Sequence, residues 1–151
     1  MSYKGIKNRM LKKYGTACWI EMLGLNKFIP NRTYKNKKEF KRMKQLTYHH
    51  IKPKIHGGVE SEENGAILSE ENHLWFHSQE KEIQEILNES FKKYQKFYEV
   101  KRKVNSNFKP TDLLNENDFI TLSKEVCAQI FEIKYLKKHD KLNIVDKDLV
   151  I

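Results

Sequence analysis

The sequence has little of what defines secreted or membrane-bound proteins. It contains two cysteines, Cys18 and Cys127, in 151 residues, which is too few for a disulfide framework, and we expect both to be buried thiols. No run approaches the roughly 20 apolar residues of a membrane-spanning helix. The basic stretch that ends at Tyr14 lacks the apolar segment of a secretory signal peptide. These absences predict a cytoplasmic, intracellular protein with no membrane span.

Charge is plentiful but unevenly distributed along the chain. Residues 1–55 contain 15 lysines and arginines and only two acidic residues, Glu21 and Glu39, for a net charge of +13. Residues 56–151 contain 14 basic and 18 acidic residues, for a net charge of −4. The basic half indicates a polyanionic partner such as nucleic acid, because lysine and arginine release counterions when they neutralise phosphates. The same charges also suit an ordinary solvated surface, so charge alone leaves both interpretations open.

Hydrophobic periodicity predicts a mainly helical chain with a small sheet. Ser69 is a good residue to cap the start of a helix. The expected helices cover 2–14, 36–43, 70–103 with a break near His77, and 117–138; the expected strands cover 46–51 and 66–68, and the apolar stretch 17–25 is either a strand or a buried turn. The fold class is therefore α+β. We expect three regions within one compact domain: a basic N-terminal region over 1–45, a small α+β segment over 46–80, and amphipathic packing or interaction helices over 81–151.

The histidines are concentrated in one part of the sequence. Five of the six lie between His49 and His77. His73 and His77 are four residues apart on a predicted helix, so both rings project from the same face and can bind one ion. The adjacent pair His49 and His50 ends a predicted strand and offers further imidazole ligands. This pattern predicts a metal site.

Residues 46–78 resemble the ββα-metal motif of HNH endonucleases, in the form found in nuclease colicins and phage enzymes. The residues that carry the resemblance are His49, His50, Gly57, Gly58, Asn64, His73 and His77. It implies a metal-dependent DNA endonuclease with a ββα-metal core over 46–80. In that case His49, His73 and His77 bind one divalent metal, His50 is the general base, and Asn64 braces the loop that holds the base.

These residue types suit the hydrolysis of a phosphodiester. A neutral imidazole, with an ordinary pKa near 6.5, can take a proton from water at neutral pH, and a bound metal stabilises the phosphate and the leaving 3′-oxygen. Successive strand residues point to opposite sides, so His49 can face the metal while His50 approaches the phosphate. By ligand type we expect zinc, nickel, manganese or cobalt, and the resemblance also allows magnesium.

Basic residues near the motif are candidates for contacts with the DNA backbone. They are Lys52 and Lys54 after the histidine pair, and Arg32, Lys35, Lys37, Lys38, Lys41, Arg42 and Lys44 before it. No separate structural zinc is expected, because Glu21 stands where a CxxC pair beginning at Cys18 needs its second cysteine. Two alternatives remain open: a non-catalytic DNA-binding module, and a nuclease subunit of a larger phage or defence assembly that binds protein partners through its C-terminal helices.

Overall fold

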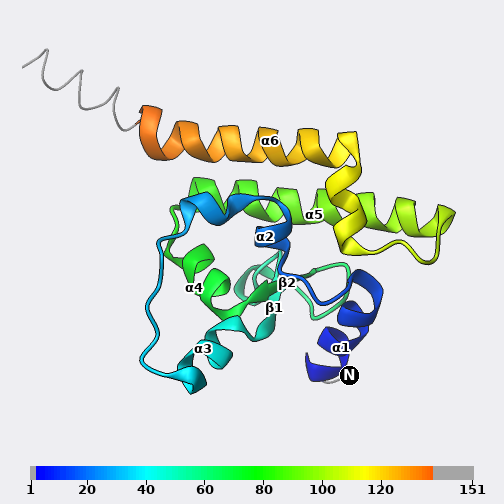
Figure 1. The fold of residues 1–151 in the computed structure, drawn as a ribbon, viewed down its shortest axis with the longest axis horizontal. Coiled ribbons are helices and arrows are strands. Elements are labelled where there is room, and N and C mark those ends of the chain that lie inside the picture. Colours follow the sequence, from blue (N-terminus) through cyan, green and yellow to red (C-terminus); the bar gives the residue numbers. More distant parts are fainter. Residues whose placement is uncertain (1–2, 138–151) are drawn as a thin grey trace, which may run out of the picture.

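The computed structural model describes residues 3–137, which form helices around a two-stranded sheet (Figure 1). In chain order the elements are α1 (Tyr3–Tyr14), α2 (Trp19–Met22), the 3-10 helix η1 (Leu25–Phe28), α3 (Lys37–Lys44), β1 (Leu46–His50), the 3-10 helix η2 (Lys54–His56), β2 (Gly65–Ser69), α4 (Glu70–Ser78), α5 (Lys81–Val104), the 3-10 helix η3 (Pro110–Asn115), α6 (Asn117–Phe131) and the π-helical η4 (Glu132–Lys137). The fold is therefore α+β and mostly helical, with a small antiparallel sheet, as the sequence predicts. No helix among these residues is both long and apolar enough to cross a bilayer.

Side-chain caps start the two helices that flank the sheet. The Asn36 side chain accepts a hydrogen bond from the backbone N–H of Glu39 at the start of α3. The Ser69 hydroxyl accepts one from the backbone N–H of Asn72 at the start of α4, so the predicted cap is confirmed. Each cap satisfies an N–H group that the helix itself leaves without a partner. Because Ser69 also ends β2, the chain passes directly from the sheet into α4.

The sheet orients the histidine pair. β1 and β2 run antiparallel, with His49 opposite Ala66 and His50 opposite Gly65. Because side chains alternate along a strand, Thr47 and His49 share one face of the sheet and His50 lies on the other. The two neighbouring histidines therefore face different surroundings.

One buried cluster extends from Ile6 to Ile133 and includes side chains from the N-terminal helix, the sheet and the C-terminal helices. Trp19 lies near its centre, with its ring stacked on Tyr94 at 4.6 Å and edge-on to Tyr14 at 5.1 Å between ring centroids. Burial of such large aromatic side chains is the main favourable contribution to folding. These ring contacts join α5 to α2 and α2 to α1.

The structure corrects the expectation for 17–25 and refines the last helix. Residues 17–25 form neither a strand nor a simple turn but contain α2 and the start of η1. An apolar run as short as this one has no clear periodicity that separates strand from helix. The helix expected over 117–138 ends as α6 at Phe131 and continues as η4, while residue 138 lies outside the described residues.

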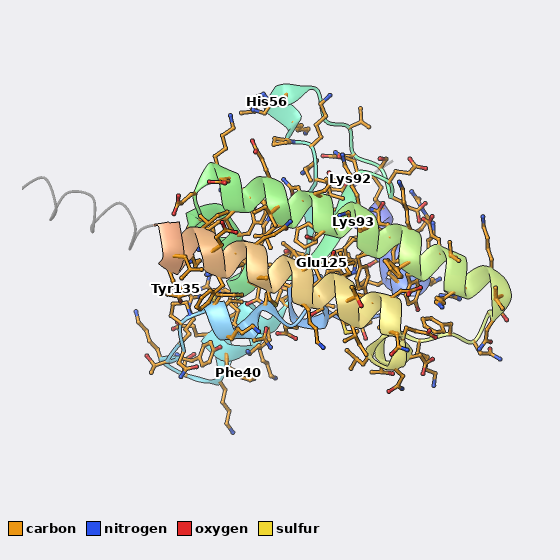
Figure 2. The ribbon with its side chains drawn as sticks, turned by 90° about the horizontal axis from the view of Figure 1, so that it is seen from above. Phe40, His56, Lys92, Lys93, Glu125 and Tyr135 are labelled. Atoms are coloured by element: carbon orange, nitrogen blue, oxygen red, sulfur yellow. The ribbon has the colours of Figure 1, made fainter. Side chains whose placement is uncertain are left out.

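α5 and α6 lie antiparallel, side by side, and form a layer over the sheet and the smaller helices (Figures 1 and 2). α6 and η4 leave Phe131, Tyr135 and Leu136 about half exposed, at 47%, 51% and 51%. An interaction between these helices and a protein partner stays a prediction.

Candidate metal centre

Three imidazole side chains converge between β1 and α4. His49 comes from the strand, and His73 and His77 come from successive turns of the helix. One nitrogen atom from each ring lies within 4.8 Å of the others. The structure therefore brings together the three residues that the sequence proposes as metal ligands, and they could hold one metal ion.

The ring of His73 is oriented by the neighbouring strand. The Thr47 hydroxyl donates a hydrogen bond to the backbone carbonyl of Leu68 at 2.8 Å. Its oxygen lies 2.9 Å from Nδ1 of His73 and, with its own proton already donated, accepts from that nitrogen. Nε2 of His73 is then left without a proton and directed at the other histidines.

The ring of His49 is buried and held by the long helix α5. Its side chain is only 3% exposed, and its Nε2 lies 2.8 Å from Oδ1 of Asn88. The rings of Phe76 and Phe91 pack edge-on against it, with centroids at 4.3 Å and 5.7 Å. One side of the centre is therefore apolar and shielded from water.

Burial keeps two of these histidines uncharged. It lowers the pKa of His49 from 6.5 to about 3, with smaller contributions from the neighbouring histidines in the same direction and an opposing one from Asn88. Burial, reinforced by the nearby His77 and His50, likewise lowers the pKa of His73 to about 4. A histidine binds a metal through the lone pair of its neutral form. Both rings therefore hold that form at neutral pH, and the donor set of three imidazoles fits a divalent transition metal.

His50, the expected general base, lies on the opposite face of β1. Its side chain is 20% exposed, and its Nε2 is 3.9 Å from a carboxylate oxygen of Glu60, which is itself 3.3 Å from Nζ of Lys54. The ring packs edge-on against Tyr48. Burial lowers the pKa of His50, while Glu60 acts in the opposite direction and Lys54 adds to the lowering.

Asn64 spans the loop that follows β1. Its Oδ1 accepts from the backbone N–H of Lys52 at 2.7 Å, and its Nδ2 donates to the carbonyls of Lys52 at 3.0 Å and Val59 at 2.8 Å. The turn between them depends on Gly57, which has a φ of 85°, and on Gly58, where an added Cβ would lie 1.8 Å from a backbone oxygen. The side chain therefore makes the contacts that a brace of this loop requires.

Gln95, a buried residue of α5, holds the other end of the same loop. It is 8% exposed, and its Nε2 lies within 3.2 Å of the backbone carbonyls of Glu62, Glu63 and Gly65. These carbonyls flank Asn64 on both sides. The long helix thus contacts His49 of the candidate metal centre through Asn88 and the Asn64 segment through Gln95.

The sequence interpretation missed three of these residues. Thr47 could have been found by strand alternation, because it is two residues before His49. Gln95 is a polar residue within the mainly apolar stripe that α5 buries, and Asn88, two turns earlier, lies beside that stripe. A buried amide such as Gln95 needs hydrogen-bond partners, and that requirement was the available signal for it.

The basic residues proposed to contact DNA have different surroundings. Lys44 forms an ion pair with Glu71, and Lys54 forms one with Glu60. Their charges are therefore partly neutralised within the protein. The remaining candidates are exposed: Arg32, Lys35, Lys37, Lys38, Lys41, Arg42 and Lys52. Four of these, Lys37, Lys38, Lys41 and Arg42, lie on α3, which ends two residues before β1 begins.

Both cysteines are buried thiols, as the sequence predicts. The sulfur of Cys18 accepts a hydrogen bond from Nδ2 of Asn72 at 3.3 Å. This contact joins the start of α2 to the first turn of α4, the helix that carries His73 and His77.

Comparisons with protein-family models, with curated proteins and with solved structures find no match to this chain.

Proposed function

We propose that this chain is a metal-dependent endonuclease of the HNH type that hydrolyses DNA phosphodiester bonds. The observation that carries the proposal is the division of four histidines by one strand. His49, His73 and His77 converge on one side of β1, and His50 lies on the other. A metal site and a separate base on the two sides of one strand could then act on the same phosphate from different directions.

In this proposal His50 takes a proton from the attacking water. Burial lowers the pKa of His50, so its ring is neutral and able to accept a proton near pH 7. The Glu60 carboxylate then favours the protonated ring that results. Asn64 holds the backbone that follows His50, so the imidazole keeps its orientation during the reaction. When a divalent metal is bound by the three other histidines, it supplies Lewis-acid stabilisation of the phosphate and the leaving oxygen.

The distribution of charge supports DNA as the substrate. α3 carries the exposed side chains of Lys38, Lys41 and Arg42 and ends two residues before β1 begins. Charges of this kind bind the phosphate backbone without reading the sequence of bases. α3 leads into the start of β1, and His50 lies at the other end of that strand, so a bound duplex would have to extend from α3 along β1 to reach it.

Cleavage of a supercoiled plasmid tests the proposal, with magnesium, manganese, nickel or zinc added separately. We expect His50→Ala to slow cleavage by about 100-fold or more, which is the usual contribution of a general base. His56→Ala is the matched control, because His56 is an exposed histidine at the tip of the loop after β1 (Figure 2). It should cleave at the wild-type rate.

Two results would contradict this proposal. Equal cleavage by wild type and His50→Ala would remove His50 as the base. Tight DNA binding by the wild type with no cleavage under any metal would favour a non-catalytic DNA-binding module instead.

A further inference from the structure

The hydrogen bond between Asn88 and His49 determines which nitrogen of His49 can bind a metal. The amide oxygen Oδ1 can only accept a hydrogen bond, and it lies 2.8 Å from Nε2 of His49. The proton of the neutral ring is therefore on Nε2. The lone pair is on Nδ1, the nitrogen that points toward α4.

The lone pair of His73 is directed at the same place. Thr47 accepts from Nδ1 of His73, so the lone pair of that ring is on Nε2. Nδ1 of His49 and Nε2 of His73 are 3.3 Å apart. Two nitrogens bound at 2.0–2.1 Å to one tetrahedral ion lie about 3.3 Å apart. Two lone pairs at this distance repel each other unless a cation lies between them.

We propose that Asn88 is a positioning residue of the metal centre, which makes His49 bind through Nδ1 while His73 binds through Nε2. Asn88 does not touch the ion but fixes the proton and the orientation of a ring that does. Such outer partners of metal-bound histidines commonly set metal affinity. The inference depends on the metal-binding part of the proposed function and not on cleavage.

Through Asn88, the long helix α5 contacts one of the three histidines of the metal centre. Asn88 lies on α5, 39 residues after His49. One turn earlier on the same helix, Gln84 donates to the carbonyls of Gln79 and His77 but to no imidazole nitrogen. Gln84 is therefore a matched amide that contacts the α4 segment without orienting a ligand ring.

The first test is titration calorimetry of the full chain with zinc ion alone. Asn88→Leu should weaken zinc binding by about 10- to 100-fold, the usual effect of losing such a partner. Asn88→Asp keeps an acceptor at the same position and should restore affinity to the wild-type value or above. Gln84→Leu should bind like the wild type. Zinc affinity of a folded Asn88→Leu within twofold of the wild type would overturn the proposal, and so would equal losses in Asn88→Leu and Gln84→Leu.

The second test needs no variant, so it holds even if Asn88→Leu does not fold. Long-range proton–nitrogen NMR correlations of the zinc-loaded wild type distinguish a protonated ring nitrogen from a metal-bound one. We expect a proton on Nε2 and zinc on Nδ1 for His49, and the reverse for His73. Zinc on Nε2 of His49 would refute the inference. A chain that binds no zinc would refute the metal centre as well, whereas one that binds zinc in this way but cleaves no DNA would refute only the nuclease.

Discussion

The buried ring of His49 makes the stability of the metal-free protein depend on pH. In the folded chain its pKa is lowered to about 3, against 6.5 for an unperturbed histidine. As the pH falls below 6.5, the unfolded chain takes up a proton at this ring while the folded chain does not. Proton uptake by the unfolded state alone favours unfolding. The stability contributed by the neutral ring is therefore present above pH 6.5 and is lost as the pH falls toward 3.

The size of the effect follows from the two pKa values. Between these two pKa values, each pH unit lowers the free energy of unfolding by about 1.4 kcal/mol. The interval from pH 7.5 to pH 5.0 includes about 1.5 such units below 6.5, so His49 alone should lower this free energy by about 2 kcal/mol. His73 and His50 act in the same direction, because their pKa values are also lowered. The carboxylates of Glu71 and Glu99 have pKa values lowered from 4.5, so they lose their contributions below this window.

Urea unfolding with a chelator present, at pH 7.5 and pH 5.0, measures this quantity. His49→Gln removes the titrating ring. Between the two pH values, the free energy of unfolding of this variant should fall by about 2 kcal/mol less than that of the wild type. His56→Gln is the matched control and should behave as the wild type does. Equal losses in wild type and His49→Gln would refute the argument that the buried neutral ring is the source of the dependence.

Two further predictions concern the loop and the DNA surface. Gln95→Leu leaves three backbone carbonyls beside Asn64 without their buried donor, so the free energy of unfolding in urea should fall by about 2 kcal/mol. Plasmid cleavage should slow as well. An unchanged urea midpoint and an unchanged cleavage rate would show that Gln95 does not hold this loop. Replacing Lys38, Lys41 and Arg42 with alanine should reduce the slope of log affinity against log salt by about 0.9 for each phosphate that the variant no longer neutralises. Fluorescence anisotropy with a labelled duplex measures that slope, and an unchanged slope would place the DNA elsewhere.

The sequence predicts those parts of the fold that depend on local rules. The β1–β2–α4 order, the Ser69 cap and the end of α4 near His77 follow from periodicity, capping and the 3.6-residue turn. The pairing of His73 with His77 follows from the same turn. The choice of His49 rather than His50 as the third ligand came from the resemblance to a known motif. Spacing along the chain does not specify the register of the two strands, and so does not show which of the two histidines faces α4.

The parts that could not be predicted depend on contacts between distant segments. The short helices within 17–25 form where the chain packs around Trp19, and no local pattern separates them from a buried strand. Gln95 is recognisable as an unusual polar residue in an apolar stripe, and Asn88 lies beside that stripe. Their partners are 30 or more residues away, so only the folded structure identifies which groups they contact.

Asn88 and Gln95 also connect two of the regions expected from the sequence, because both lie in 81–151 and contact residues of 46–80. A boundary after residue 80 separates α4 from α5, but it does not separate the site from its support. His49 obtains its fixed proton from α5, and the backbone around Asn64 obtains its buried donor from the same helix. Gln95 gives buried backbone carbonyls the donor that they need, whereas Asn88 contacts a ring of the candidate metal centre. α5 therefore contributes to the candidate site, through the contact of Asn88 with His49 and the contacts of Gln95 beside Asn64, as well as to the buried core.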